Sequence, residues 1–264
     1  MMKKLLLFFA LFSFAIVSAQ GVIPVKLLSN AKSGPERYVG ADAYGSQYTI
    51  FDNEFRKDAE RGRLKFKVLS LGQVYRADIQ NPLQLVLFYK AFNTAVLLDN
   101  QLNETSRINF SNIPQPIIAD AVGLASQNRL WVYDINTQQI GLYDLAQGAF
   151  RAITPPFNDR IRYYQNDYNY FYWIDSQNRC HAVNLFGKVN FLGNVPEFGH
   201  AQFISSGALL LSREGALYHY NLASEKLTPV TIVEKSFRDF YLAGDILSIF
   251  TDSEIIQYKV TLPK

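Results

Sequence analysis

The sequence of 264 residues contains a single cysteine, Cys180, and three histidines. One cysteine excludes an internal disulfide, so packing has to stabilise the fold. Cys180 lies in an apolar segment beside His181, and we interpret it as a small buried hydrophobic residue rather than a reactive thiol. The histidines do not have the H-x-x-x-H or H-E-x-x-H spacing of a zinc site, so no metal is expected.

An excess of charge of one sign is also missing, because 26 basic residues are matched by 23 acidic ones. Removal of Lys3 and Lys4 with an N-terminal leader leaves 24 basic residues and a formal net charge of +1. Such a chain lacks the field that gathers nucleic acid or anionic lipid. The sequence has no G-x-S-x-G motif and no glycine-rich phosphate loop, so we expect neither an enzyme nor a cofactor.

The long apolar run of the sequence lies at the N-terminus. Lys3 and Lys4 precede the apolar stretch Leu5–Val17, and small residues follow it. Residues 1–19 are therefore predicted to be a cleaved signal peptide that exports the chain to the periplasm. The run is short for a membrane span, and the residue directly after the cleavage point is not the cysteine that a lipid anchor requires, so we expect no membrane anchor.

The rest of the chain is rich in strand-forming residues. Runs of Val, Ile, Leu, Tyr and Phe alternate with Gly, Asn, Asp and Ser turns, most clearly in Pro116–Pro155, which predicts four antiparallel strands. The same unit recurs, and the ends of its second strands lie 37 to 44 residues apart. These ends are Asp52, Lys90, Asp134, Asp175, Ser212 and Thr251. A period near 40 residues with this strand content predicts an all-β, six-bladed β-propeller, as a single domain over residues 20–264.

Two segments complete the expected ring. The expected blades are 36–70, 74–110, 116–155, 161–193, 201–231 and 237–262. The last of them has three strands, and Val22–Leu28 is predicted to supply the fourth, which removes an open sheet edge. In the first blade, the charged segment Asn53–Arg63 either carries the third strand or forms a loop beyond it.

The innermost strands of the expected blades repeat an aspartate. The five positions are Asp42, Asp78, Asp120, Asp167 and Asp239. Innermost strands line the axial channel of a propeller, where a ring of carboxylates would bind a cation or a basic ligand. Alternatively, each carboxylate accepts backbone N–H groups and fixes a loop, as Asp does at the ends of strands.

Two further groups are candidates for binding a partner. The charged segment supplies Arg56, Lys57, Arg61 and Arg63, either as a solvated face or as a binding loop. The fourth blade supplies Tyr163, Tyr164 and Tyr168, at the start of an aromatic concentration that continues to Trp173. These rings either form a platform for a protein or a sugar, or they fill the space between blades.

The run NPLQLVLFYKAFNTAVLLDNQLNE (Asn81–Glu104), with the later segments LWVYD and YNYFYWID, resembles exported propeller-like proteins of Bacteroidota. The family is that of the periplasmic plug of the type 9 secretion translocon. The resemblance implies a propeller that binds the periplasmic mouth of a large outer-membrane β-barrel and closes it. It implies no individual contact residue.

We therefore expect a non-enzymatic periplasmic propeller that plugs, or docks on, an outer-membrane protein-secretion channel. The alternative is a propeller that binds a small ligand, a cation or a glycan in its axial channel. A hydrolase with carboxylates from distant blades is a further, less favoured alternative, because propellers host many functions.

Overall fold

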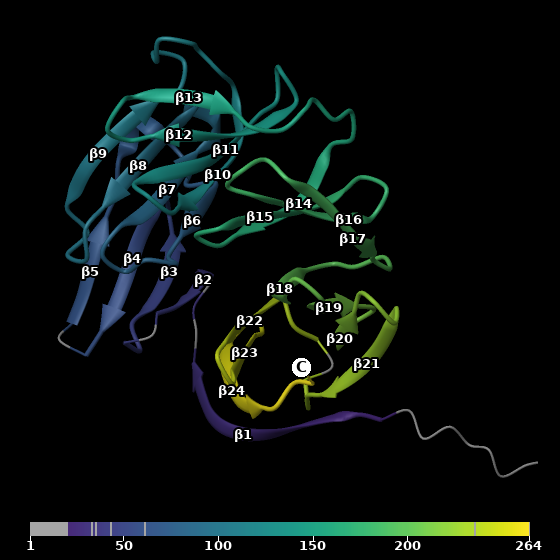
Figure 1. Cartoon of the computed structure of the whole chain (residues 1–264). Coiled ribbons are helices and arrows are strands. Elements are labelled where there is room, and N and C mark those ends of the chain that lie inside the picture. Colours follow the sequence, from purple (N-terminus) through teal and green to yellow (C-terminus); the bar gives the residue numbers. More distant parts are fainter. Residues whose placement is uncertain are drawn as a thin grey trace, which may run out of the picture.

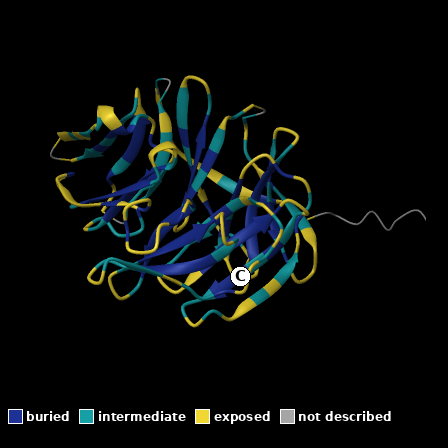
Figure 2. Cartoon of the chain, turned by 90° about the horizontal axis from the view of Figure 1, so that it is seen from above, coloured by how far each residue is buried: buried dark blue, intermediate teal, exposed yellow. Residues whose placement is uncertain are grey.

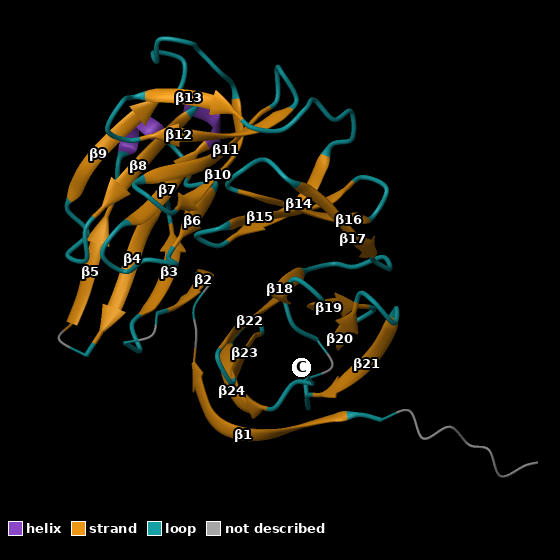
Figure 3. Cartoon of the chain, viewed as in Figure 1, coloured by secondary structure: helices purple, strands orange, loops and turns teal. Residues whose placement is uncertain are grey.

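The structure is a computed structural model that describes residues 21–32, 34, 36–42, 44–60, 62–234 and 236–263. The predicted signal peptide lies outside the described residues. The described chain is all-β, as predicted, and consists almost entirely of strands and short connections (Figure 3). Two 3-10 turns in the described chain, η1 (Leu69–Leu71) and η2 (Lys90–Phe92), interrupt the connections.

Four antiparallel sheets contain four strands each, in sequence order. Sheet I contains β2 (Arg37–Ala41), β3 (Gln47–Phe51), β4 (Glu54–Ala59) and β5 (Gly62–Phe66). Sheet II contains β6 (Arg76–Asp78), β7 (Leu85–Tyr89), β8 (Thr94–Leu98) and β9 (Glu104–Asn109). Sheet III contains β10 (Ala119–Ala125), β11 (Arg129–Asp134), β12 (Gln139–Asp144) and β13 (Ala149–Ala152). Sheet IV contains β14 (Ile161–Asn166), β15 (Tyr170–Asp175), β16 (Arg179–Asn184) and β17 (Val189–Asn194).

The remaining strands form one eight-stranded sheet, in the order β18-β19-β20-β21-β1-β24-β23-β22. Its first half contains β18 (Ala201–Ser205), β19 (Ala208–Arg213), β20 (Ala216–Asn221) and β21 (Lys226–Thr231). Its second half contains β1 (Ile23–Lys32), β22 (Asp239–Ala243), β23 (Ile246–Phe250) and β24 (Glu254–Val260). Figure 1 shows β1 along the outside of this curved sheet.

The predicted use of the N-terminal strand is confirmed. Strand β1 pairs antiparallel with β24 along most of its length, from Val25 opposite Val260 to Lys32 opposite Glu254. The strand also makes a short parallel contact with β21, where Ile23 lies opposite Val230. This second contact was not predicted, and it merges two expected four-stranded sheets into one. Both ends of the described chain are thereby held in a single sheet, and the open edge is removed.

The core is divided among the spaces between neighbouring sheets. Trp131 from sheet III is fully buried and lies in one cluster with Phe171 and Trp173 from sheet IV. Equivalent clusters lie between sheets I and II and between sheets II and III. Figure 2 shows buried residues along the strands and exposed residues in the connecting loops. The aromatic and branched side chains that define the strands in the sequence thus pack sheet against sheet.

Polar residues at the ends of two of the second strands bond the chain that enters the same sheet. Asp134 is buried, and its Oδ1 accepts the backbone N–H of Ile118, on the chain that enters sheet III. Ser212 Oγ likewise accepts the N–H of His200, on the chain that enters β18. Each of these side chains fastens the incoming chain to the second strand of its own sheet. Asp134 also accepts the N–H groups of Asn136 and Thr137, so it caps the turn after β11 as well.

The charged segment of the first blade forms the third strand, β4, which was one of the two predicted alternatives. The first strand of sheet II is short, because ladder pairing covers Arg76–Asp78. The three residues that follow β7 form η2, which is closed by Asn93 with left-handed backbone angles.

Candidate functional site

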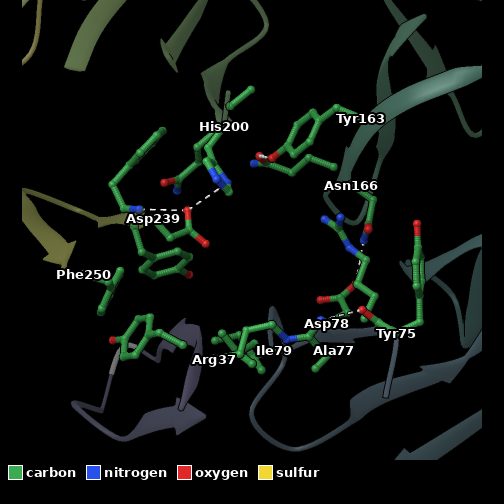
Figure 4. Close-up of a pocket in the computed structure, with 18 of the residues that line it drawn as sticks. Arg37, Tyr75, Ala77, Asp78, Ile79, Tyr163, Asn166, His200, Asp239 and Phe250 are labelled. Atoms are coloured by element: carbon green, nitrogen blue, oxygen red, sulfur yellow. Dashed lines mark hydrogen bonds and ion pairs between the residues drawn. The ribbon is translucent and has the colours of Figure 1, made fainter. Parts of the chain in front are cut away.

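The first strands of the sheets surround a cavity of about 550 Å³ (Figure 4). Its walls come from β2, β6, β14, β18 and β22, from residues flanking them, and from Phe250 at the end of β23. We call it the axial cavity, because these are the innermost strands of the sheets. Its volume is in the range of pockets that hold small molecules.

Much of the polar lining of the axial cavity is occupied with joining neighbouring sheets. The amide of Gln165 on β14 donates to the carbonyl of Phe203 on β18 and accepts the N–H of the same residue, at 3.0 and 2.9 Å. Gln202 on β18 makes the same pair of bonds with Leu242 on β22, both at 2.8 Å. Each side chain thus satisfies the inner edge of the next innermost strand, which has no ladder partner.

Asp78 and Asn166 form hydrogen bonds with the inner edge of β10 in the same way. Asp78 Oδ2 accepts the N–H of Leu124 at 2.8 Å and the Nδ2–H of Asn166 at 2.7 Å. Asn166 Nδ2 also donates to the carbonyl of Leu124 at 3.1 Å. The second carboxylate oxygen of Asp78 accepts the N–H of Gln80. Sheets II, III and IV therefore meet at one hydrogen-bonded point, which Figure 4 shows on one wall of the cavity.

Three arginines line the axial cavity, and they differ in their partners. Arg162 pairs with Glu197 and donates to the carbonyl of Phe198, so its charge is compensated. Arg37 donates to two carbonyl oxygens, of Val74 and Tyr75, at 2.8 and 3.1 Å. Burial, followed by the nearby charge of Arg76, lowers the pKa of Arg37.

Arg76 lies at the first position of β6, and its guanidinium carbon is 4.0 Å from the centre of the Tyr164 ring. Within the described ranges, no carboxylate lies within ion-pair distance of Arg76 or of Arg37. The two carboxylates of the cavity are engaged elsewhere, since Asp78 holds the inner edge of β10 and Asp239 faces His200 at 3.4 Å. Burial raises the pKa of Asp239, and the charges of His200 and Arg37 oppose this rise.

The five aspartates predicted to form a ring lie in different places. Asp78 and Asp239 line the axial cavity. Asp42 and Asp167 cap the turns after β2 and β14, accepting backbone N–H groups and the hydroxyls of Tyr48 and Tyr172, respectively. Asp120 forms an ion pair with Lys90. The carboxylates therefore do not gather into one site. Three lie at or just after the ends of β2, β6 and β14, whereas Asp120 and Asp239 lie at the starts of β10 and β22.

The predicted partner-binding residues on the charged segment are mostly engaged within sheet I. Arg56 pairs with Glu36 and Glu54. Lys57 is buried and donates to the carbonyl of Asn100. Arg63 is exposed and pairs with Asp58 through two short bonds. Arg61 lies outside the described residues.

The predicted aromatic candidates divide between the core and the surface. Tyr164 is buried, with its hydroxyl at the backbone of Val122. Tyr163 lines the axial cavity, and burial raises its pKa to about 12. Tyr168 is 40% exposed. Phe171 and the aromatic residues after it fill the space between sheets, which was the alternative interpretation of this segment.

The cysteine and histidines form no metal centre. Cys180 is buried as predicted, and burial raises the pKa of its thiol to about 12, so it is a poor nucleophile at neutral pH. His219 is buried, and His181 stacks on Trp173. In the part of the chain that the structure describes, no group of three or more His, Cys, Asp or Glu residues is placed to hold a metal ion. The same residues include no helix long and apolar enough to cross a membrane.

The sequence analysis missed Arg37, Arg76, Gln165 and Asn166 as cavity residues. A polar residue within an otherwise apolar innermost strand was the available signal, and only its aspartates were used. Asn166 and Arg76 lie 90 residues apart in the sequence, so their common wall depends on how the sheets are arranged.

Comparison with known proteins supports the fold. No protein-family model matches the chain, and no curated protein matches it in sequence. Virginiamycin B lyase from Staphylococcus aureus is similar in structure, with a TM-score of 0.60 and 10% identity over 90% of this chain and 100% of that one. A member of the DUF4221 family from Bacteroides vulgatus has a TM-score of 0.58 and 10% identity over 92% and 99%.

BamB from Moraxella catarrhalis is also similar, with a TM-score of 0.50 and 9% identity over 89% of this chain and 99% of that chain. Virginiamycin B lyase and BamB are β-propellers, so the chain has a propeller fold, as its sequence predicts. At these identities the likeness concerns the fold alone.

Proposed function

We propose that this protein is a non-enzymatic binding propeller that docks on the periplasmic side of an outer-membrane protein-secretion channel and plugs it. In this proposal the eight-stranded sheet counts as two blades joined by β1, which makes a ring of six. The leader-like residues 1–19 and the family resemblance around Asn81–Glu104 support the location and the class of partner. The observation that carries the docking role is an exposed apolar surface on one end of the ring.

This surface, which we call the apolar rim, lies on the loops where the chain enters sheets II and III and on the loops after β7 and β11. It consists of Leu69, Tyr75, Phe92, Ile118 and Ile135, which are 82%, 47%, 49%, 50% and 43% exposed. Monomeric proteins rarely keep large apolar side chains together in water, and such patches commonly mark binding surfaces for other proteins.

Contacts along the loops connect the members of the apolar rim. The Phe92 ring lies over Gly72, where an added Cβ would be 3.6 Å from it, and Gly72 closes the turn that carries Leu69. The side chain of Asn93 donates to the carbonyl of Ile117 at 2.6 Å. The N–H of Ile135 donates to the carbonyl of Ile118 at 2.9 Å. The rim is therefore one arc from the chain that enters sheet II to the loop after β11 in sheet III.

The test is a pull-down of the tagged full chain from detergent-solubilised envelope of the bacterium that makes it, with the captured proteins identified by mass spectrometry. We expect recovery of a β-barrel large enough to be a secretion channel. The double variant Leu69→Ser/Phe92→Ser should lose this recovery while keeping the circular dichroism spectrum and melting temperature of the parent.

Phe186→Ser is the matched control, because Phe186 is 92% exposed on the β16–β17 connection, at the opposite end of its sheet. This variant should retain the channel. Recovery of no large barrel from the parent chain refutes the partner, and full recovery by the folded double variant refutes the apolar rim as the docking surface.

A further inference from the structure

We propose that the axial cavity binds a small organic anion through the guanidinium groups of Arg37 and Arg76. The ligand class is a compound that carries a carboxylate or phosphate group on a flat ring. This site adjoins the apolar rim at Tyr75 and is otherwise built from other residues, and binding there neither requires nor excludes docking on a secretion channel.

The two guanidinium groups are distinguished by the lack of a carboxylate at ion-pair distance in the described chain, and not by a lack of hydrogen bonds, since Arg37 donates to two carbonyl oxygens. Gln165 and Gln202 bond the inner edges of neighbouring strands, and Asp78 accepts three hydrogen bonds. Arg37 and Arg76, in contrast, have no carboxylate at ion-pair distance among the described residues. An anion in the cavity would supply the opposite charge at ion-pair distance that these two side chains lack.

The two arginines come from neighbouring sheets and lie close together. Arg37 at the start of β2 bonds the carbonyls of Val74 and Tyr75, and Arg76 is the next residue along the chain. Each cation therefore repels the other in the empty cavity. The planar fork of a guanidinium matches the two oxygens of a carboxylate or phosphate, and an anion near both side chains would offset both charges.

Arg76 is also fixed in direction. Its guanidinium stacks on Tyr164, which is buried and bonded to Val122. Stacking on an aromatic face leaves the edge N–H groups of a guanidinium free to donate in its own plane. The side chain is thus held in one orientation before a ligand arrives, which reduces the entropy lost on binding.

The wall beside Arg37 provides a flat apolar surface. Tyr38 and Phe250 stack with ring centres 4.0 Å apart, and Tyr241 packs edge-on against Tyr38 at 6.1 Å. All three line the axial cavity. A ligand with its anionic group at the arginines would extend its ring toward these aromatic residues, and the cavity volume of about 550 Å³ accommodates a molecule of this size.

The experiment measures binding by isothermal titration calorimetry on the mature chain, with benzoate, phenyl phosphate and neutral benzamide as probes. We expect saturable binding of benzoate or phenyl phosphate, weakened by added salt, and at least about tenfold weaker binding of benzamide. The benzoate and phenyl phosphate arms distinguish a carboxylate site from a phosphate site. Absence of saturable binding of both anions up to about 10 mM overturns the proposal.

Variants locate the site. Arg76→Gln and, separately, Arg37→Gln should each weaken binding of the anion about tenfold or more, whereas Arg76→Lys should retain part of it. Arg107→Gln is the control, because Arg107 pairs with Glu104 on the outer strand β9. If Arg76→Gln fails to fold, Arg37→Gln decides the question alone. Unchanged affinity in a folded Arg37→Gln or Arg76→Gln protein overturns the proposal.

Discussion

Two aspartates that look equivalent in the sequence, Asp78 and Asp120, are expected to differ sharply in their contribution to stability. Asp78→Ala removes the acceptor of three hydrogen bonds, from Gln80, Leu124 and Asn166. It also leaves the N–H of Leu124, a buried residue, without a partner. Asp120→Ala removes an ion pair with Lys90 in which both side chains are partly exposed.

The magnitudes follow from these contacts. Hydrogen bonds to a charged group contribute roughly 1.5–3 kcal/mol each to the free energy of unfolding. The three bonds of Asp78 share one carboxylate and are not additive, so we expect Asp78→Ala to lower the free energy of unfolding by about 3–5 kcal/mol. For a domain of this size, that loss lowers the melting temperature by roughly 10 °C. A partly exposed ion pair contributes about 0–1 kcal/mol, so Asp120→Ala should melt within a few degrees of the parent.

The assay is urea denaturation followed by circular dichroism and tryptophan fluorescence, with melting curves on the same samples. Asp78→Asn is an informative third variant, because its amide oxygen can still accept from Leu124 and its stability should lie between those of the parent and Asp78→Ala. Equal losses in Asp78→Ala and Asp120→Ala, or a loss below about 1 kcal/mol in Asp78→Ala, would contradict the account of how sheets II to IV are joined.

Two further predictions concern sheets III and IV. Gly123→Ala should destabilise the fold by about 1–3 kcal/mol, because its Cβ would lie 2.0 Å from Asn166 Oδ1. In the Asn166→Ala background the same change should destabilise the fold much less, and a double-mutant cycle of urea midpoints measures the difference. For Asp175, burial opposes ionisation, but the N–H and guanidinium groups of Arg179 outweigh it and lower the pKa of this carboxyl. The ionised carboxyl therefore stabilises the fold above the unfolded-state pKa of about 3.9, and this stabilisation is lost as the pH falls toward the lower folded pKa. Urea midpoints of the parent should drop on acidification below about pH 4, and those of Asp175→Asn should drop less steeply. Parallel pH profiles for the two proteins would refute this.

The strands, their turns and the partner of the N-terminal strand were identified from the sequence. The alternation of apolar strands and polar turns in Pro116–Pro155 predicted sheet III, and the second-strand ends Asp134 and Ser212 bond the chain that enters their sheets. The unpaired strand near the N-terminus was correctly placed beside β24, because a three-stranded final unit leaves an edge to fill. The burial of Cys180 followed from its residue type.

The hydrogen-bond partners of the polar residues around the axis were not predictable from the sequence in this way. Asp42 and Asp78 occupy similar positions in the sequence pattern, yet the first caps a turn and the second bonds two other sheets. The difference depends on short β6 and on the inner edge of β10, which lies beside it in space. A local pattern contains no information about which inner edge a side chain will meet.

The sequence by itself determined the all-β fold, the repeated four-stranded unit and the closure by the N-terminal strand, because strand propensity, turn chemistry and edge pairing act over short distances. The tertiary structure alone decided what lines the axis. Arg37 and Arg76 come from different sheets, and Asn166 reaches Asp78 across 88 residues. Their juxtaposition arises when the sheets pack around a common cavity, and among the described residues that packing places no carboxylate at ion-pair distance from Arg37 or Arg76.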